Sequence, residues 1–113
     1  MANLVYFDAD ADSDDVLTTL REDGACVLVD VMSDELRSRV DSELRPFIAS
    51  TPTGRDDFSG RLTARTGALV ARSEAARELV MHPTTTDLAR QFLEPYTDKI
   101  QLHLTQIINI QPG

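Results

Sequence analysis

Residues 99–113 read Lys99-Ile-Gln-Leu-His-Leu-Thr-Gln-Ile-Ile-Asn-Ile-Gln-Pro-Gly113, and this stretch decides the fold. Apolar and polar side chains alternate along it, which is typical of a β-strand. The apolar face holds Ile100, Leu102, Leu104, Ile108 and Ile110, and the polar face holds Gln101, His103, Thr105, Asn109 and Gln111. Only Gln106 and Ile107 break the alternation. Because so long a strand needs partners for its backbone and its apolar face, we expect most of the sheet to be missing. The sequence is then the front part of a larger protein.

Composition and charge narrow the class of protein. The 113 residues are 42% hydrophobic but only 5% aromatic, with no Trp, which is thin for a self-sufficient core. A net charge of −8 argues against nucleic acid or an anionic membrane as a partner. No apolar run is long enough to span a bilayer, and we expect no signal peptide. A single cysteine, Cys26, gives no disulfide framework, so we expect a cytoplasmic protein.

The remaining residues predict helices with short strands between them. We expect one incomplete domain over residues 1–113, with a flexible acidic lead-in over 1–12, a mostly helical part over 13–98 and the long strand over 99–113. Ser13 is the expected cap of the first helix and Gly24 its end, while Pro46 should bend or close the second helix. The predicted elements are a helix over 13–23, a strand over 25–29, a helix capped by Ser33, a loop over 50–60, a strand over 61–65, and helices over 74–81 and 85–93.

No short motif in the sequence supplies a catalytic or metal site. The acidic stretch from Asp8 to Asp15 places carboxylates at three positions of a calcium loop. However, Ser13 stands where that loop needs Gly, and Thr19 stands where it needs Glu. His82 and His103 are isolated from any carboxylate pattern with metal-ligand spacing. There is also no Gly-rich phosphate loop and no nucleophile elbow.

Three stretches of the chain share a likeness to one known family. They are Asp23-Gly-Ala-Cys-Val-Leu-Val29; Arg61-Leu-Thr-Ala-Arg-Thr-Gly-Ala-Leu-Val-Ala-Arg-Ser73 with Ala76-Arg-Glu-Leu-Val-Met-His-Pro83; and Gln101-Leu-His-Leu-Thr-Gln-Ile-Ile-Asn-Ile-Gln-Pro-Gly113. Over roughly residues 14–113 the sequence resembles the N-terminal half of a phytanoyl-CoA dioxygenase family protein. Members of that family are Fe(II)- and 2-oxoglutarate-dependent oxygenases.

The resemblance implies a fold and a function for the full-length protein. The fold is α+β, with N-terminal helices and the first strands of a truncated double-stranded β-helix, a jelly-roll or cupin-like barrel. The cofactors are Fe(II) and 2-oxoglutarate, and the partners are dioxygen and a small-molecule or acyl-type substrate to be hydroxylated. The family's His-x-Asp iron ligands follow a turn like Pro112-Gly113. The chain then holds no catalytic residue and no metal ligand, and alone it should be inactive.

The resemblance also implies that one face of the long strand looks into the barrel. Polar side chains buried there would need partners, which a bound cofactor or substrate could supply. On this basis Asn109, Thr105 and Arg65 are predicted to bind the cofactor, and Gln101 and Ile107 the substrate. The alternatives are that the polar face is exposed to solvent and that Arg65 is a surface charge. The alternative function is a small acidic protein-interaction module that uses an exposed strand edge.

Overall fold

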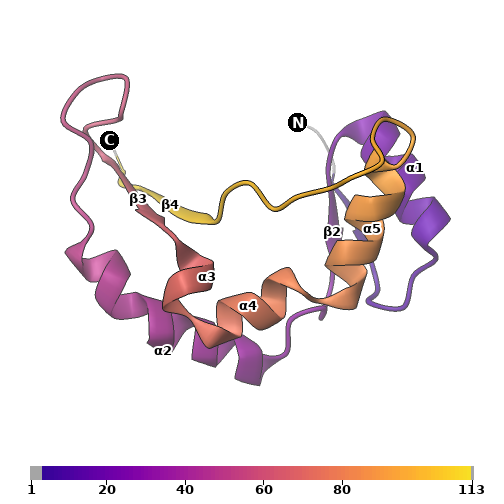
Figure 1. Ribbon diagram of the computed structural model, residues 1–113, viewed down its shortest axis with the longest axis horizontal. Coiled ribbons are helices and arrows are strands. Elements are labelled where there is room, and N and C mark those ends of the chain that lie inside the picture. Colours follow the sequence, from indigo (N-terminus) through magenta and orange to yellow (C-terminus); the bar gives the residue numbers. More distant parts are fainter. Residues whose placement is uncertain (1–3, 113) are drawn as a thin grey trace. The chain divides into compact units, whose positions relative to one another are not determined.

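A computed structural model describes residues 4–112 (Figure 1). It is an α+β structure with two separate two-stranded sheets. Its elements, in chain order, are β1 (Val5–Phe7), α1 (Ser13–Asp23), β2 (Cys26–Leu28), α2 (Asp34–Ser50), β3 (Thr63–Gly67), α3 (Leu69–Arg72), α4 (Glu74–Val80), α5 (Pro83–Leu93) and β4 (Gln106–Ile110). None of the helices within residues 4–112 is long and apolar enough to span a membrane. The first three residues of the predicted lead-in, and Gly113 of the predicted Pro-Gly turn, lie outside the described residues.

The described residues form two units, each with its own sheet. The first unit consists of residues 4–33 and 81–100, and the second of residues 34–80 and 101–112. In the first unit β1 and β2 pair in parallel, with Val5 opposite Cys26 and Phe7 opposite Leu28. The prediction of a flexible lead-in is therefore wrong for residues 5–7. Their aromatic and β-branched side chains favour a strand, and β2 satisfies their backbone groups.

Helix α1 has the predicted bounds but a different cap. The side chain of Asp12 accepts a hydrogen bond from the Asp14 N–H at 2.8 Å, so Asp12 is the cap residue where Ser13 was predicted. Both residue types suit this position, so the sequence pattern alone does not choose between neighbours. Gly24 ends the helix as predicted, because it adopts a left-handed conformation with φ of +79° and donates its N–H to the Leu20 carbonyl.

Helix α5 starts two residues earlier than predicted, at Pro83, because proline fits the first position of a helix. Helices α1 and α5 pack together in the first unit. The Arg21 guanidinium lies over the Phe92 ring, 6.0 Å from its centroid.

In the second unit, α2 carries the main apolar side chain of the core. Leu44 is 1% exposed, and it lies on one face of the helix with Val40, four residues earlier, and Phe47, three residues later. Pro46 does not close the helix, which continues to Ser50. The hydroxyl groups of Ser50 and Thr51 both donate to the Phe47 carbonyl, which helps to satisfy the last turn after the proline.

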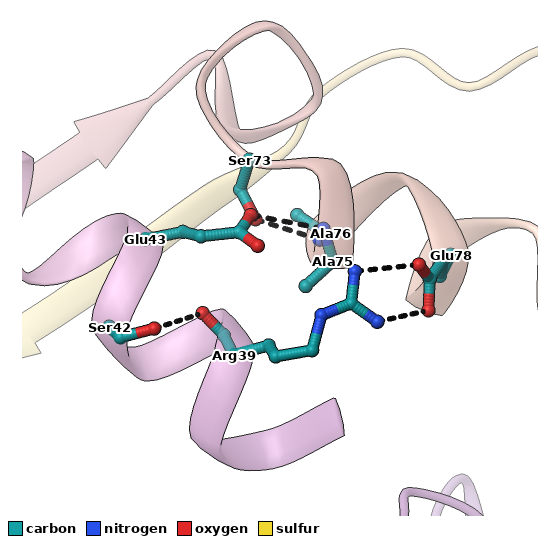
Figure 2. Close-up of polar contacts among 7 residues, drawn as sticks. All are labelled: Arg39, Ser42, Glu43, Ser73, Ala75, Ala76 and Glu78. Carbon is teal, nitrogen blue, oxygen red and sulfur yellow. Dashed lines mark hydrogen bonds and ion pairs between the residues drawn. The ribbon is translucent and has the colours of Figure 1, made fainter. Parts of the chain in front are cut away.

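Side chains of α2 hold the start of α4 (Figure 2). One carboxylate oxygen of Glu43 accepts from the Ser73 hydroxyl at 2.7 Å and from the Ala75 N–H at 3.1 Å. Ser73 is itself 1% exposed, and its oxygen accepts from the Ala76 N–H at 2.8 Å. Nearby, Arg39 makes two hydrogen bonds to the carboxylate of Glu78. The N–H groups at the start of α4 are therefore capped by Ser73, which directly precedes the helix, and by the Glu43 carboxylate of α2.

The second sheet pairs β3 with β4 in antiparallel order (Figure 1). The register runs from Thr63 opposite Ile110 to Gly67 opposite Gln106. The predicted long strand is thus limited to five residues, and residues 99–105 lie outside any strand. The partner strand β3 begins two residues later than predicted. It is also only five residues long, so β4 can form backbone hydrogen bonds with it over only five residues. The alternation of apolar and polar residues therefore extends over residues that have no partner strand.

Candidate functional site

The β3–β4 pair has two faces, which the register assigns. Residues directly opposite each other in an antiparallel ladder point to the same side, and neighbours along a strand point to opposite sides. One face, here named the covered face, carries Ala64, Thr66, Ile107 and Asn109. The other, here named the open face, carries Thr63, Arg65, Ile108 and Ile110.

Burial distinguishes the two faces. On the covered face Ala64 and Thr66 are buried, with Thr66 2% exposed. The Thr66 hydroxyl donates to the hydroxyl of Thr51, the residue that follows α2, at 2.8 Å. On the open face Ile108 is 55% exposed and Ile110 is 72% exposed. The helical layer of the second unit therefore packs on the covered face, and two large apolar side chains face solvent on the other.

The residues predicted to bind the cofactor do not share a face. Asn109 is exposed at the end of the covered face, opposite Ala64, whereas Arg65 lies on the open face. Thr105 precedes β4, and its hydroxyl oxygen accepts the Leu69 N–H at 3.1 Å, which holds the start of α3. Asn109 and Thr105 were predicted from the polar stripe and Arg65 from the family resemblance, and neither source indicates which face the helices cover.

The predicted substrate residues are also separated. Ile107 is half-buried on the covered face, opposite Thr66. Gln101 is exposed and lies outside β4. Neither residue lies next to Arg65 on the open face.

Arg65 borders a hollow of about 300 Å³ on the second unit. The lining residues are Thr51, Pro52, Thr53, Gly54, Ser59, Thr63 and Arg65. The Arg65 guanidinium donates to the Ser59 carbonyl, and within residues 4–112 it has no carboxylate partner. A guanidinium beside several hydroxyl groups is suited to a carboxylate or another small oxyanion. The sequence pattern predicts only a loop over residues 50–60, although Gly54, Asp56 and Gly60 are residue types of a tight turn.

The first unit has a smaller hollow, of about 210 Å³, between the end of β1 and the starts of α1 and α5. Its charged lining residues are Asp8, Asp10 and Asp87, so it is acidic. Across residues 4–112, no three His, Cys, Asp or Glu side chains are grouped so that they could hold a metal ion. The described residues therefore do not fit an iron centre.

Comparison with known proteins gives a distant likeness to a dioxygenase. The chain is 24% identical over 99 residues to Dioxygenase swnH2 of Arthroderma benhamiae. The match covers 84% of the chain and 32% of that protein, so the chain spans about a third of the length of the curated relative it matches. No protein-family model matches the sequence. The chain is thus similar to part of a dioxygenase.

Proposed function

We propose that the chain is the N-terminal part of a non-haem Fe(II)- and 2-oxoglutarate-dependent dioxygenase that hydroxylates a small-molecule or acyl-type substrate. The observation that carries this proposal is the match of 84% of the chain to a dioxygenase. The resemblance of three stretches to the phytanoyl-CoA dioxygenase family adds the cofactors and the jelly-roll barrel. The exposed apolar face of β3–β4 supports a larger sheet in the whole protein, because a second sheet would cover it.

In this proposal the iron does not bind to the chain itself. Residues 4–112 offer no group of three metal-binding side chains, so the iron ligands belong to another part of the whole protein. The chain contributes one wall of the site and a positive charge. It is accordingly inactive alone.

We further propose that ligands bind on the open face. Arg65 provides the charge, and its guanidinium can form paired hydrogen bonds with a carboxylate of 2-oxoglutarate. Ile108 and Ile110 provide an apolar surface beside it. Of the three residues predicted to bind the cofactor, only Arg65 is retained. Asn109 and Thr105 are left out, because one lies on the covered face and the other holds α3.

The coding sequence that contains this chain gives the first test. The proposal requires a His-x-Asp pair within about twenty codons after Gly113, because two histidines and a carboxylate make the iron site. The longer protein should then form succinate from 2-oxoglutarate only when Fe(II) is present. A native stop codon directly after Gly113 would overturn the proposal. It would favour the alternative, an acidic interaction module that uses the edge of β4.

A further inference from the structure

The loop that borders the Arg65 hollow is locked by one aspartate. The Oδ1 atom of Asp56 accepts from the Ser59 N–H at 2.7 Å and from the Ser59 hydroxyl at 2.6 Å. The Gly60 N–H donates to the Asp56 backbone carbonyl at 2.9 Å. These contacts close residues 56–60 into a tight turn, here named the Asp56 turn.

The Asp56 turn packs closely against Gly54, which lies just before it in the chain. The Gly54 N–H donates to the carbonyls of Gly60 and Thr63, at 3.1 and 3.0 Å. A Cβ atom at Gly54 would lie 2.6 Å from the Ser59 carbonyl carbon and oxygen, so only glycine fits there without a shift of the backbone. The Ser59 carbonyl is therefore held in place by the loop on one side and by Asp56 on the other.

The fixed Ser59 carbonyl is the group that holds Arg65. It accepts a hydrogen bond from the Arg65 guanidinium at the edge of the hollow. The hydrogen bonds from the Ser59 hydroxyl and N–H keep the pKa of Asp56 below its ordinary value, so its carboxylate is charged at neutral pH. The adjacent Asp57 takes no part in this chain of contacts, since it pairs with Arg61 at 2.8 Å.

We propose that Asp56 is a positioning residue for Arg65. It fixes the Ser59 carbonyl, and that carbonyl holds the long arginine side chain at the hollow before a ligand arrives. A guanidinium that is already oriented loses less conformational freedom when it binds a carboxylate. This inference rests on the proposed function, because it takes Arg65 as the group that binds the ligand carboxylate.

The test is a titration of the longer protein that contains this chain with 2-oxoglutarate, followed by ¹⁵N NMR of the Arg65 Nε–H group. Asp56→Ala should weaken binding by about tenfold, because Arg65 is no longer preorganised. Asp56→Asn should bind nearly as the unaltered chain does, since an amide oxygen can still accept from Ser59. The matched control is Asp57→Ala on the same loop, which should leave the dissociation constant unchanged.

A second arm separates positioning from folding. Asp56→Ala should have no further effect on binding in a chain that already carries Arg65→Ala, because the two residues act through one contact. If Asp56→Ala unfolds the chain, Ser59→Ala replaces it. That change removes the hydrogen bond from the Ser59 hydroxyl to Asp56 Oδ1 but keeps the one from the Ser59 N–H, so it should give a smaller loss of affinity.

The outcomes distinguish the two proposals. Binding by Arg65→Ala equal to that of the unaltered chain would overturn the ligand role of Arg65. A loss with Arg65→Ala but none with Asp56→Ala or Ser59→Ala would overturn only the positioning role. Equal losses from Asp56→Ala in chains with and without the Arg65→Ala change would also overturn it.

Discussion

Arg65 of β3 lies directly opposite Ile108 of β4, so a charged and an apolar side chain share the open face of the pair. Such a face suits a ligand that has both a carboxylate and an apolar part. Asn109, one residue further along β4, points to the other side and lies opposite Ala64. The register between β3 and β4 therefore decides which of the predicted residues can contact the same ligand.

The first prediction concerns Arg65 in the longer protein. Arg65→Ala should raise the KM for 2-oxoglutarate by about tenfold to a hundredfold, or about 1.5–3 kcal/mol, the usual contribution of a hydrogen bond to a charged group. Asn109→Ala is the matched control and should change KM by less than about twofold, because Asn109 lies on the covered face. Steady-state kinetics with varied 2-oxoglutarate would measure both. The reverse ranking of the two variants would show that ligands bind on the covered face.

The second prediction compares two apolar residues of the second unit. Leu44→Ala should lower the free energy of unfolding by about 2–5 kcal/mol, because Leu44 is 1% exposed and its loss leaves a cavity. Ile108→Ala in the isolated chain should cost less than about 1 kcal/mol, since Ile108 is 55% exposed. The sequence places Ile108 on the apolar face of the strand, and the structure leaves this face exposed. Urea unfolding of both variants provides the measurement, and similar costs would contradict the open face.

The third prediction concerns the cap of α4 (Figure 2). Ser73→Ala should destabilise the chain by about 1–3 kcal/mol, because the Ala76 N–H loses its acceptor and the Glu43 carboxylate loses the hydrogen bond from the Ser73 hydroxyl. Ser42→Ala is the control, since the exposed Ser42 hydroxyl only donates to the Arg39 carbonyl of its own helix. It should change stability by at most about 0.5 kcal/mol. Thermal melts would compare them, and equal effects would remove the cap role of Ser73.

The fourth prediction is a dependence of stability on pH. The hydrogen bonds from Ser73 and then from Ala75 lower the pKa of Glu43, and the hydrogen bond from Arg39 lowers the pKa of Glu78. The unfolded chain binds a proton at each of these carboxylates more tightly than the folded chain does. The stabilisation that the two charged carboxylates provide is therefore complete above the ordinary glutamate pKa of 4.5. It is lost as the pH falls through the lowered values. Urea unfolding between neutral and acidic pH should show this loss, and Glu43→Gln should reduce its slope. An unchanged slope in Glu43→Gln would contradict the assignment.

The sequence determined features that depend on residues close together in the chain. Gly24 ends α1 because the backbone there needs a positive φ, and the stripe that contains Leu44 forms the buried side of α2. Alternation along residues 108–110 likewise assigned Ile108 and Ile110 to one face of a strand and Asn109 to the other. Capping was less certain, since Asp12 and Ser13 are both good cap residues.

Only the tertiary structure decided which face of that strand is covered and which residues meet Arg65. Alternation has a period of two and is the same whichever side the helices pack on, so it does not show that Asn109 and Arg65 lie on different faces. The length of β4 depends on β3, a strand nearly forty residues earlier, and not on its own pattern. The hollow likewise depends on the Asp56 turn folding back to bring the Ser59 carbonyl to Arg65. Local preferences fix elements and their faces, whereas the site requires contacts between segments that no single stretch of sequence contains.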